Sequence, residues 1–273
     1  MITDRFLVAA GTVIGIEHRL RGRNNQDGFA VMADENNLAA IVCDGCSSSP
    51  GSEVGAKLIA RLAADSILKL MARKQASAGS EILPLLREEI LFRLRAITRE
   101  LPEPGNAVDE MFLATIIGAT VNDHTASVFS LGDGIFSVNG QSEVIDENNR
   151  PNYLAYSLSP GDYPEVDQQS IDFILRKEIP TSDFESLAIA TDGAAEFEKK
   201  KNQTFTVLGK EETVRGFAQF EQEERYLKNP SLLAKRLFLL NAEKTTIDWS
   251  GRQVSRFPGI FNDDTTIVLI RRR

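Results

Sequence analysis

The sequence predicts an α+β fold in which antiparallel β-sheets are covered on the outside by helices. Short apolar segments typical of strands and longer segments with helical periodicity follow one another in an irregular order along the chain. This order differs from the regular strand–helix alternation of parallel sheets. The chain has 273 residues, 42% hydrophobic and 26% charged, which is an ordinary globular composition. We therefore expect one domain that spans residues 1–273.

Each element is predicted from its own periodicity. The strands are short runs rich in Val, Ile, Phe and Ala between turn residues, and we expect them at 6–16, 28–33, 38–43, 112–120, 125–131, 134–138, 169–176, 186–191 and 265–270. The helices carry one apolar stripe near the 3.6-residue period, and we expect them at 51–71, 81–100, 193–199, 210–225 and 230–243. Residues 146–168 are rich in Asn, Pro, Gly and Asp, so we expect an irregular excursion there.

Composition excludes several classes of protein. The net charge of −8 disfavours a nucleic-acid binder, which would normally present a basic face. The longest apolar runs are too short to span a bilayer, so no membrane association is expected. Two cysteines in a chain of this length argue against a disulfide scaffold, and the first residues show no secretory signal. These observations favour a cytoplasmic protein.

Four acidic motifs stand beside the predicted strands. A carboxylate at a buried strand end must meet a cation or several hydrogen-bond donors, because a bare charge is strongly disfavoured there. Several converging carboxylates also repel one another, and a divalent metal removes that repulsion. The motifs are Asn25-Gln26-Asp27, Asp44-Gly45, Thr191-Asp192-Gly193 and Asn262-Asp263-Asp264.

Oxygen ligands of this kind suit hard divalent cations such as Mg²⁺ and Mn²⁺. The chain holds only two His and two Cys, so a zinc site is poorly supported. The expected ligands of two metal ions are Asp27, Asp44, Asp192, Asp263 and the carbonyl of Gly45. Two such ions can lower the pKa of a shared water for attack on phosphorus.

Two alternative interpretations of these motifs are simpler. Asp-Gly is a common turn dipeptide, so each motif alone is weak evidence, whereas the four together in this order are much stronger. Cys43 and Cys46 have the spacing of a zinc or redox pair, but no further ligands lie nearby in the sequence. Cys43 is expected in the core and Cys46 nearer the surface.

The motifs as a set resemble the metal-dependent protein phosphatases of type 2C. The resemblance spans residues 11–271, essentially the whole chain. It implies two packed antiparallel β-sheets flanked by helices, two or three Mn²⁺ or Mg²⁺ ions and hydrolysis of phosphoserine and phosphothreonine in proteins such as a kinase or a kinase target. It also implies that Asp133 lies in the outer part of the acidic cluster. The residues that carry it are Asn25-Gln26-Asp27, Val42-Cys43-Asp44-Gly45, Leu131-Gly132-Asp133-Gly134, Ala190-Thr191-Asp192-Gly193 and Asp263-Asp264-Thr265-Thr266.

The chain departs from the family pattern close to these motifs. The family's usual histidine after Asp-Gly, a general-acid candidate, is Cys46, and its double glycine is Ser47-Ser48. The usual phosphate-binding arginine falls on Gly22, so Arg19, Arg21 and Arg23 become the candidates for that role, and His18 becomes a candidate general acid. The departures leave two other functions open, a catalytically weak or inactive binding module and a small-molecule phosphoesterase.

Overall fold

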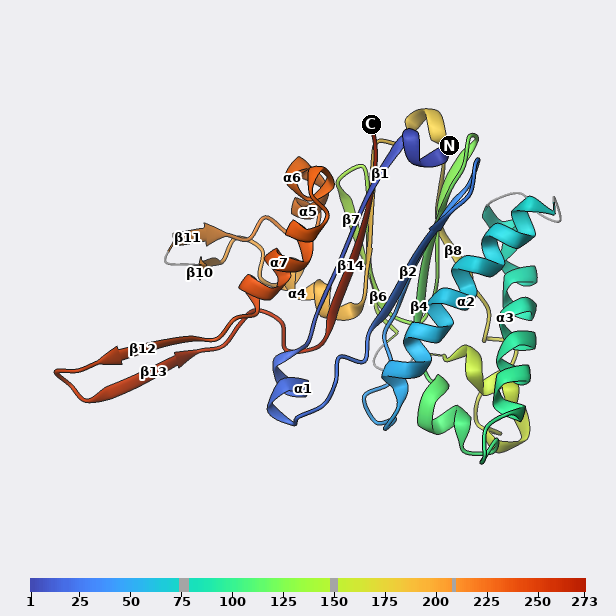
Figure 1. The fold of residues 1–273 in the computed structure, drawn as a ribbon, viewed down its shortest axis with the longest axis horizontal. Coiled ribbons are helices and arrows are strands. Elements are labelled where there is room, and N and C mark those ends of the chain that lie inside the picture. The colour runs from blue at the N-terminus through green and yellow to red at the C-terminus, as the bar shows by residue number, and fades with distance from the viewer. Residues whose placement is uncertain (74–78, 148–151, 208–209) are drawn as a thin grey trace.

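The computed structural model describes residues 1–73, 79–147, 152–207 and 210–273, and its centre is a pair of packed five-stranded sheets (Figure 1). Every strand pair in both sheets is antiparallel. The first sheet contains, in spatial order, β1 (Phe6–Val13), β14 (Thr265–Arg272), β9 (Ser186–Ala190), β6 (Gly134–Val138) and β7 (Gln141–Ile145). The second contains β2 (Gly28–Ala33), β3 (Leu38–Cys43), β4 (Ile116–Val121), β5 (Thr125–Leu131) and β8 (Ile174–Pro180).

Helices cover the outer face of each sheet, as Figure 1 shows. Two long helices, α2 (Ser52–Ala72) and α3 (Ile82–Arg99), lie against the second sheet. The helices on the side of the first sheet are α4 (Glu196–Lys199), α5 (Gln219–Gln222), α6 (Glu224–Lys228) and α7 (Ser231–Leu240). The predicted α+β fold with two packed sheets flanked by helices is confirmed.

The layers create three apolar cores, and strand β3 shows how the sequence builds them. Side chains alternate between the two faces of a strand. Ala39, Ile41 and Cys43 therefore pack against the helices, while Leu38, Ala40 and Val42 pack between the sheets. All six residues of β3 are buried, which explains why this strand is a continuous apolar run.

Two connections carry the chain from one sheet to the other, both at the same end of the sandwich. β5 in the second sheet is followed by β6 in the first sheet after only Gly132 and Asp133. Gly132 has a φ of +91°, in the left-handed region that favours glycine. A short helix, α1 (Ile16–Leu20), separates β1 of the first sheet from β2 of the second.

Several predicted elements differ from the structure. The strand expected at 6–16 ends at Val13, and α1 follows it. The strand expected at 112–120 begins at Ile116, because Val108–Phe112 (η3) forms a π-helical turn. The strand expected at 169–176 is β8, shifted to Ile174–Pro180. The irregular excursion at 146–168 contains two short 3-10 helices, η4 (Leu154–Leu158) and η5 (Pro160–Asp162), while residues 148–151 lie outside the described part.

The helix predicted at 210–225 is wrong. Its first residues form β11 (Lys210–Thr213), which pairs with β10 (Thr204–Val207) in a small two-stranded sheet. Gly216, with a φ of +89°, then interrupts the segment before the short helices α5 and α6. A second unpredicted pair, β12 (Lys244–Asp248) and β13 (Gln253–Phe257), projects from the body as a hairpin (Figure 1).

The helices also bear on membrane association. Among the described residues, no helix is both long enough and apolar enough to cross a bilayer.

Candidate metal centre

The predicted carboxylates come from both sheets and meet at one end of the sandwich. In the second sheet, Gly28 pairs with Cys43, so Asp27 and Asp44 extend from neighbouring strands at the same edge. In the first sheet, Ile267 pairs with Ala190, which brings the segments holding Asp192 and Asp263 to the corresponding edge. A cavity of about 280 Å³ lies between these ends, and its lining includes Asp44, Gly45, Asp133, Asp192 and Asp263.

Asp27, the residue before β2, is almost completely buried, with 2% of its surface exposed. The hydroxyl of Thr191 donates to its Oδ2 at 2.8 Å. Thr191 Oγ1 in turn accepts from the backbone N–H of Thr266 at 3.0 Å, so this hydroxyl joins the two sheets. The contact follows from strand alternation, because Thr191 continues the face of β9 that points between the sheets.

Several buried carboxylate oxygens in this region lack a donor. Within the described part of the chain, the Oδ1 atoms of Asp27, Asp133 and Asp192 are buried and have no hydrogen-bond partner. A buried carboxylate oxygen without a donor is costly, and a divalent cation is the natural counter-charge for several of them. The donor set is made of oxygen, which suits Mg²⁺ or Mn²⁺. These residues therefore fit a site for hard divalent metal ions.

Burial and mutual repulsion raise the pKa of each of these carboxyl groups. Burial raises the pKa of Asp44 well above its usual value, and the charges of Asp192 and Asp27 raise it further. Burial, with repulsion from Asp263 and Asp133, raises the pKa of Asp192 to about 6. Burial also raises the pKa values of Asp27, Asp133 and Asp263. In the metal-free protein the ionised forms of these carboxyl groups therefore repel one another. A bound cation would offset that repulsion.

Two glycines allow the carboxylate segments to approach each other. A Cβ atom on Gly45 would lie 2.8 Å from the carbonyl oxygen of Gln26, and one on Gly193 would lie 2.1 Å from the carbonyl oxygen of Asp264. Both contacts are with backbone atoms, so a larger side chain could not be accommodated by rotation alone. Gly45 forms an antiparallel β-bridge with Ala114. The N–H of the next residue, Thr115, donates to the carbonyl of Asp44.

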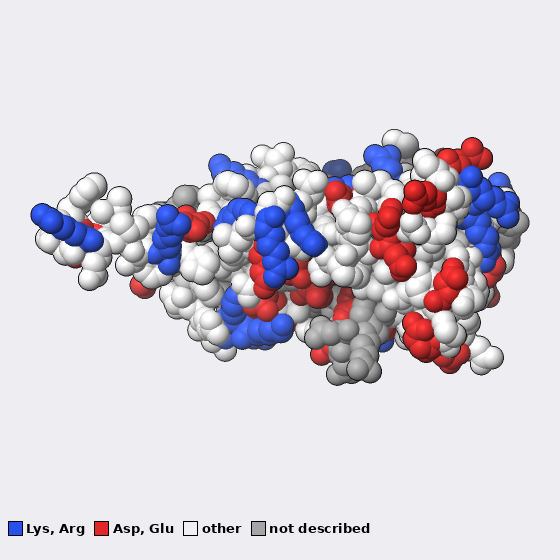
Figure 2. Space-filling model, turned by 90° about the horizontal axis from the view of Figure 1, so that it is seen from below, with Lys and Arg blue, Asp and Glu red and all other residues white. Residues whose placement is uncertain are grey.

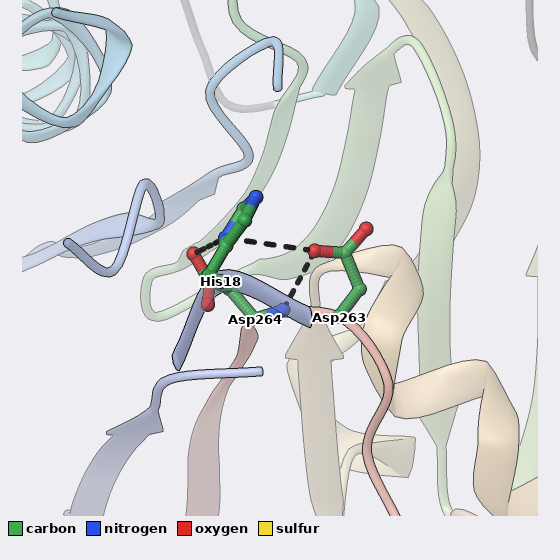
Figure 3. Close-up of side chains that lie close together, drawn as sticks. All are labelled: His18, Asp263 and Asp264. Carbon is green, nitrogen blue, oxygen red and sulfur yellow. Dashed lines mark hydrogen bonds and ion pairs between the residues drawn. The ribbon is translucent and has the colours of Figure 1, made fainter. Parts of the chain in front are cut away.

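Asp264, which the sequence analysis did not assign to the site, organises the loops around it (Figure 3). Its side chain is 1% exposed and accepts three hydrogen bonds. The N–H of Gly15 donates to Oδ1 at 2.6 Å, and the N–H of Gln26 donates to Oδ2 at 2.6 Å. His18 Nδ1 lies 2.8 Å from the same Oδ2. Asp264 thus ties α1 and the Asp27 segment to the start of β14.

His18, Asp263 and Asp264 form a compact group whose ligand atoms lie within 4.8 Å of one another. Figure 3 shows the three side chains converging from α1 and from the segment before β14. Asp264 is already satisfied by its three donors, so it is better suited to positioning than to metal binding. Asp263 is different, because its side chain is 52% exposed and lines the cavity. His18 is buried beside them, 4.0 Å from Asp263 Oδ1.

The three candidate arginines have different surroundings. Arg19 donates to the carbonyl of Asn241 at 3.3 Å, at the end of α7. Arg21 forms an ion pair with Glu17 one helical turn earlier, at 3.2 Å. Arg23 donates to the carbonyl of Ser47, a residue that lines the carboxylate cavity. Of the three, Arg23 is therefore the one in direct contact with the rim of the centre.

Cys46 also lines the cavity, together with Tyr153. Its Sγ lies 3.1 Å from the hydroxyl of Ser48. Partial burial alone would raise the pKa of the thiol, but hydrogen bonds from Ser48 and Tyr153 outweigh it and lower that pKa. Both cysteines are free; Cys43 is buried and Cys46 is partly exposed, in agreement with the sequence-based expectation. Tyr153 could not be anticipated, because it lies in the excursion without periodicity.

Comparison with known proteins assigns this chain to a family. The family model for protein phosphatase 2C matches residues 14–233, so the chain belongs to that family. Among solved structures, a mutant form of a bacterial serine phosphatase aligns with a TM-score of 0.54 at 15% identity, covering 97% of each chain. The unmutated bacterial serine phosphatase aligns with a TM-score of 0.50 at 16% identity and the same coverage. At this identity the structural likeness concerns the fold. Curated protein sequences provide no match to the chain.

Proposed function

We propose that this protein is a metal-dependent serine/threonine protein phosphatase and that residues 1–273 act as one catalytic domain. The observation that carries the proposal is the group of buried, unpartnered carboxylate oxygens at the junction of the two sheets. Membership of the protein phosphatase 2C family supports the same conclusion. The substrate class we propose is a phosphoserine or phosphothreonine protein, such as a kinase or a kinase target.

The proposed ligands of two Mn²⁺ or Mg²⁺ ions are Asp27, Asp44, Asp192, Asp263 and the carbonyl of Gly45, with Asp133 at the outer edge. When bound, such ions would supply an activated water and offset charge on the phosphoryl oxygens. The chain itself would hold the phosphoryl group in the carboxylate cavity, with the guanidinium of Arg23 beside it at Ser47. A guanidinium suits this role because it donates two parallel hydrogen bonds to phosphate oxygens.

Protonation of the leaving oxygen is the step for which this chain differs most from its family. Cys46 stands where the resemblance expects a histidine, and its thiol lines the cavity. His18 is the proposed general acid, although Asp264 occupies its Nδ1, so only Nε2 is available for that role. Its effect should be largest for alkoxide leaving groups, which need a proton more than a nitrophenolate does.

The direct test is hydrolysis of p-nitrophenyl phosphate and of a phosphoserine peptide, each with added Mn²⁺ and with EDTA. We expect turnover of both substrates with Mn²⁺ and its loss in EDTA. Asp192→Asn should lower turnover by at least about a hundredfold, because it weakens a metal that activates water. Glu35→Gln is the matched control, since it removes one carboxylate from the exposed turn at the far end of β2 and β3.

The outcomes separate the candidate functions. Activity that survives exhaustive chelation would contradict the metal-dependent mechanism. Turnover of p-nitrophenyl phosphate without any turnover of phosphopeptides would instead favour a small-molecule phosphoesterase. A folded protein that binds Mn²⁺ and hydrolyses neither substrate would be a non-catalytic binding module.

A further inference from the structure

Two adjoining cavities run along the exposed side of α7, and we name them together the α7 groove. Their volumes are about 560 Å³ and about 370 Å³, and Val207 and Leu239 line both of them. The hairpins β10–β11 and β12–β13 contribute to its walls through residues such as Phe205 and Phe257. Part of its lining is buried and apolar, including Leu240 and Ile260. The groove is therefore deep enough to accept bulky apolar side chains.

The charged side chains that line the α7 groove are mostly positive, whereas the chain as a whole is negatively charged. Among the described residues, five basic side chains line it against one acidic side chain, Glu212, although the chain carries a net charge of −8. The basic residues are Lys200, Arg225, Lys235, Arg236 and Lys244. Such a concentration of one sign attracts an oppositely charged partner.

Three of these basic side chains already have acidic partners, and two do not. Arg236 pairs with Glu212 at 2.5 Å, while Lys200 and Arg225 pair with neighbouring glutamates. Lys235 and Lys244 are exposed and have no acidic partner within 4.0 Å among the described residues. Figure 2 shows Lys and Arg side chains on the projecting hairpin and on the surface between it and the middle of this face, with Asp and Glu side chains interspersed. The groove thus presents uncompensated positive charge beside an apolar floor.

The α7 groove also adjoins the carboxylate cavity. Asn262 lines the groove, and the next residue, Asp263, lines the cavity of the metal centre. An extended chain advances about 3.3 Å per residue. A segment bound in the groove could therefore present a side chain to the centre a few residues further along.

We propose that the α7 groove docks an acidic segment of the protein substrate that carries bulky apolar side chains. This inference rests on the proposed phosphatase function and names how its substrate is selected. The apolar side chains would fill the two cavities, and the acidic ones would face Lys235 and Lys244. A second copy of the chain is a poorer occupant, because a symmetric dimer centred on the groove would bring the two basic rims together.

Binding of unphosphorylated peptides tests the groove independently of catalysis. The probes are three fluorescein-labelled 16-residue peptides: one with alternating Glu and Leu or Phe, one with Lys in place of Glu, and one with Ala in place of the apolar residues. Fluorescence anisotropy measures their affinity for the full chain. We expect the acidic, apolar peptide to bind at least about tenfold more tightly than either of the others.

The groove variant is Lys235→Glu with Lys244→Glu, and its matched control reverses two exposed charges elsewhere, Arg99→Glu with Lys177→Glu. Only the groove variant should weaken binding of the acidic peptide, by about tenfold. Both should hydrolyse p-nitrophenyl phosphate at the wild-type rate. With a phosphoserine added to the acidic peptide, the groove variant should raise KM and leave kcat nearly unchanged.

Three results would overturn the docking proposal. One is equal binding of the acidic and the basic peptide; another is equal loss of binding in the groove and control variants. The third is that the wild type sediments as a dimer and that only the groove variant sediments as a monomer. The occupant of the groove would then be a second copy of the chain. If the peptide binds as expected but the wild type lacks phosphatase activity, the docking proposal stands and the proposed function fails.

Discussion

Removing one buried carboxylate should stabilise the metal-free protein, and Asp192→Asn is the clearest case. Burial and the neighbouring Asp263 and Asp133 raise the pKa of Asp192 from 3.8 to about 6. A carboxyl group whose pKa is higher in the folded state stabilises the fold in its protonated form. That contribution is fully present below the unfolded pKa and is lost as the pH rises through about 6.

The size of the effect follows from the pKa difference. At pH 7.5 Asp192 is ionised in both the folded and the unfolded protein. A pKa difference of about two units then destabilises the fold by about 3 kcal/mol. For a chain of this size, removing that destabilisation raises the melting temperature by roughly 6–12 °C. Asparagine keeps the shape of aspartate and carries no charge, so the variant should gain most of this amount. The gain should fall to roughly half by pH 5, where wild-type Asp192 is already largely protonated.

The measurement is thermal unfolding followed by circular dichroism in EDTA, at pH values from 5 to 8. Added Mn²⁺ should reverse the order, because the wild type retains the full ligand set and gains more from binding. Glu35→Gln should leave the melting temperature nearly unchanged across the range. If the Asp192→Asn variant is no more stable than wild type in EDTA at pH 7.5, these carboxylates do not destabilise the metal-free fold by mutual repulsion.

Three other substitutions test the geometry of the centre. Gly193→Ala should destabilise the protein by about 1–3 kcal/mol in urea unfolding, because the new Cβ would lie 2.1 Å from a backbone oxygen; a neutral result would contradict that packing. Asp264→Ala should cost about 3–5 kcal/mol and lower p-nitrophenyl phosphate turnover, since three buried donors lose their acceptor; unchanged stability would show that the loops hold without it. Cys46→His should raise phosphopeptide turnover by about tenfold and aryl phosphate turnover by less. If it does little and His18→Ala shows the selective loss, His18 already fills the role, whereas equal effects on both substrates would remove the general-acid hypothesis.

The parts of the centre that the sequence could predict are those with a strong local signal. Asp44 follows a six-residue apolar run, and Asp192 follows the shorter run 187–190 after one threonine, so their positions at buried strand ends could be inferred directly. Asp264 has the same local signal as Asp263, and only the three-dimensional structure distinguishes their surroundings. Its three donors come from residues about 240 to 250 positions away, which no local pattern reveals.

The errors in the fold have a similar cause. β12 and β13 are exposed along their whole length, so no alternation of apolar and polar residues marks them as strands. The segment 210–225 contains enough Glu, Lys and Arg to favour a helix, but pairing with β10 and the left-handed Gly216 override that preference. Helices α2 and α3 were predictable because each is long and has one buried stripe.

The origin of the carboxylates in two different sheets has a mechanical consequence. Asp27 and Asp44 extend from one sheet, whereas Asp192 and Asp263 extend from the other. The separation between the two pairs is therefore set by the thickness of the apolar layer between the sheets, which includes Phe136. Because protein interiors are close-packed, a change of volume in that layer moves the sheets and, with them, the opposing carboxylates. Interior residues of this apolar layer thus act as a spacer that sets the distance between the two pairs of carboxylates.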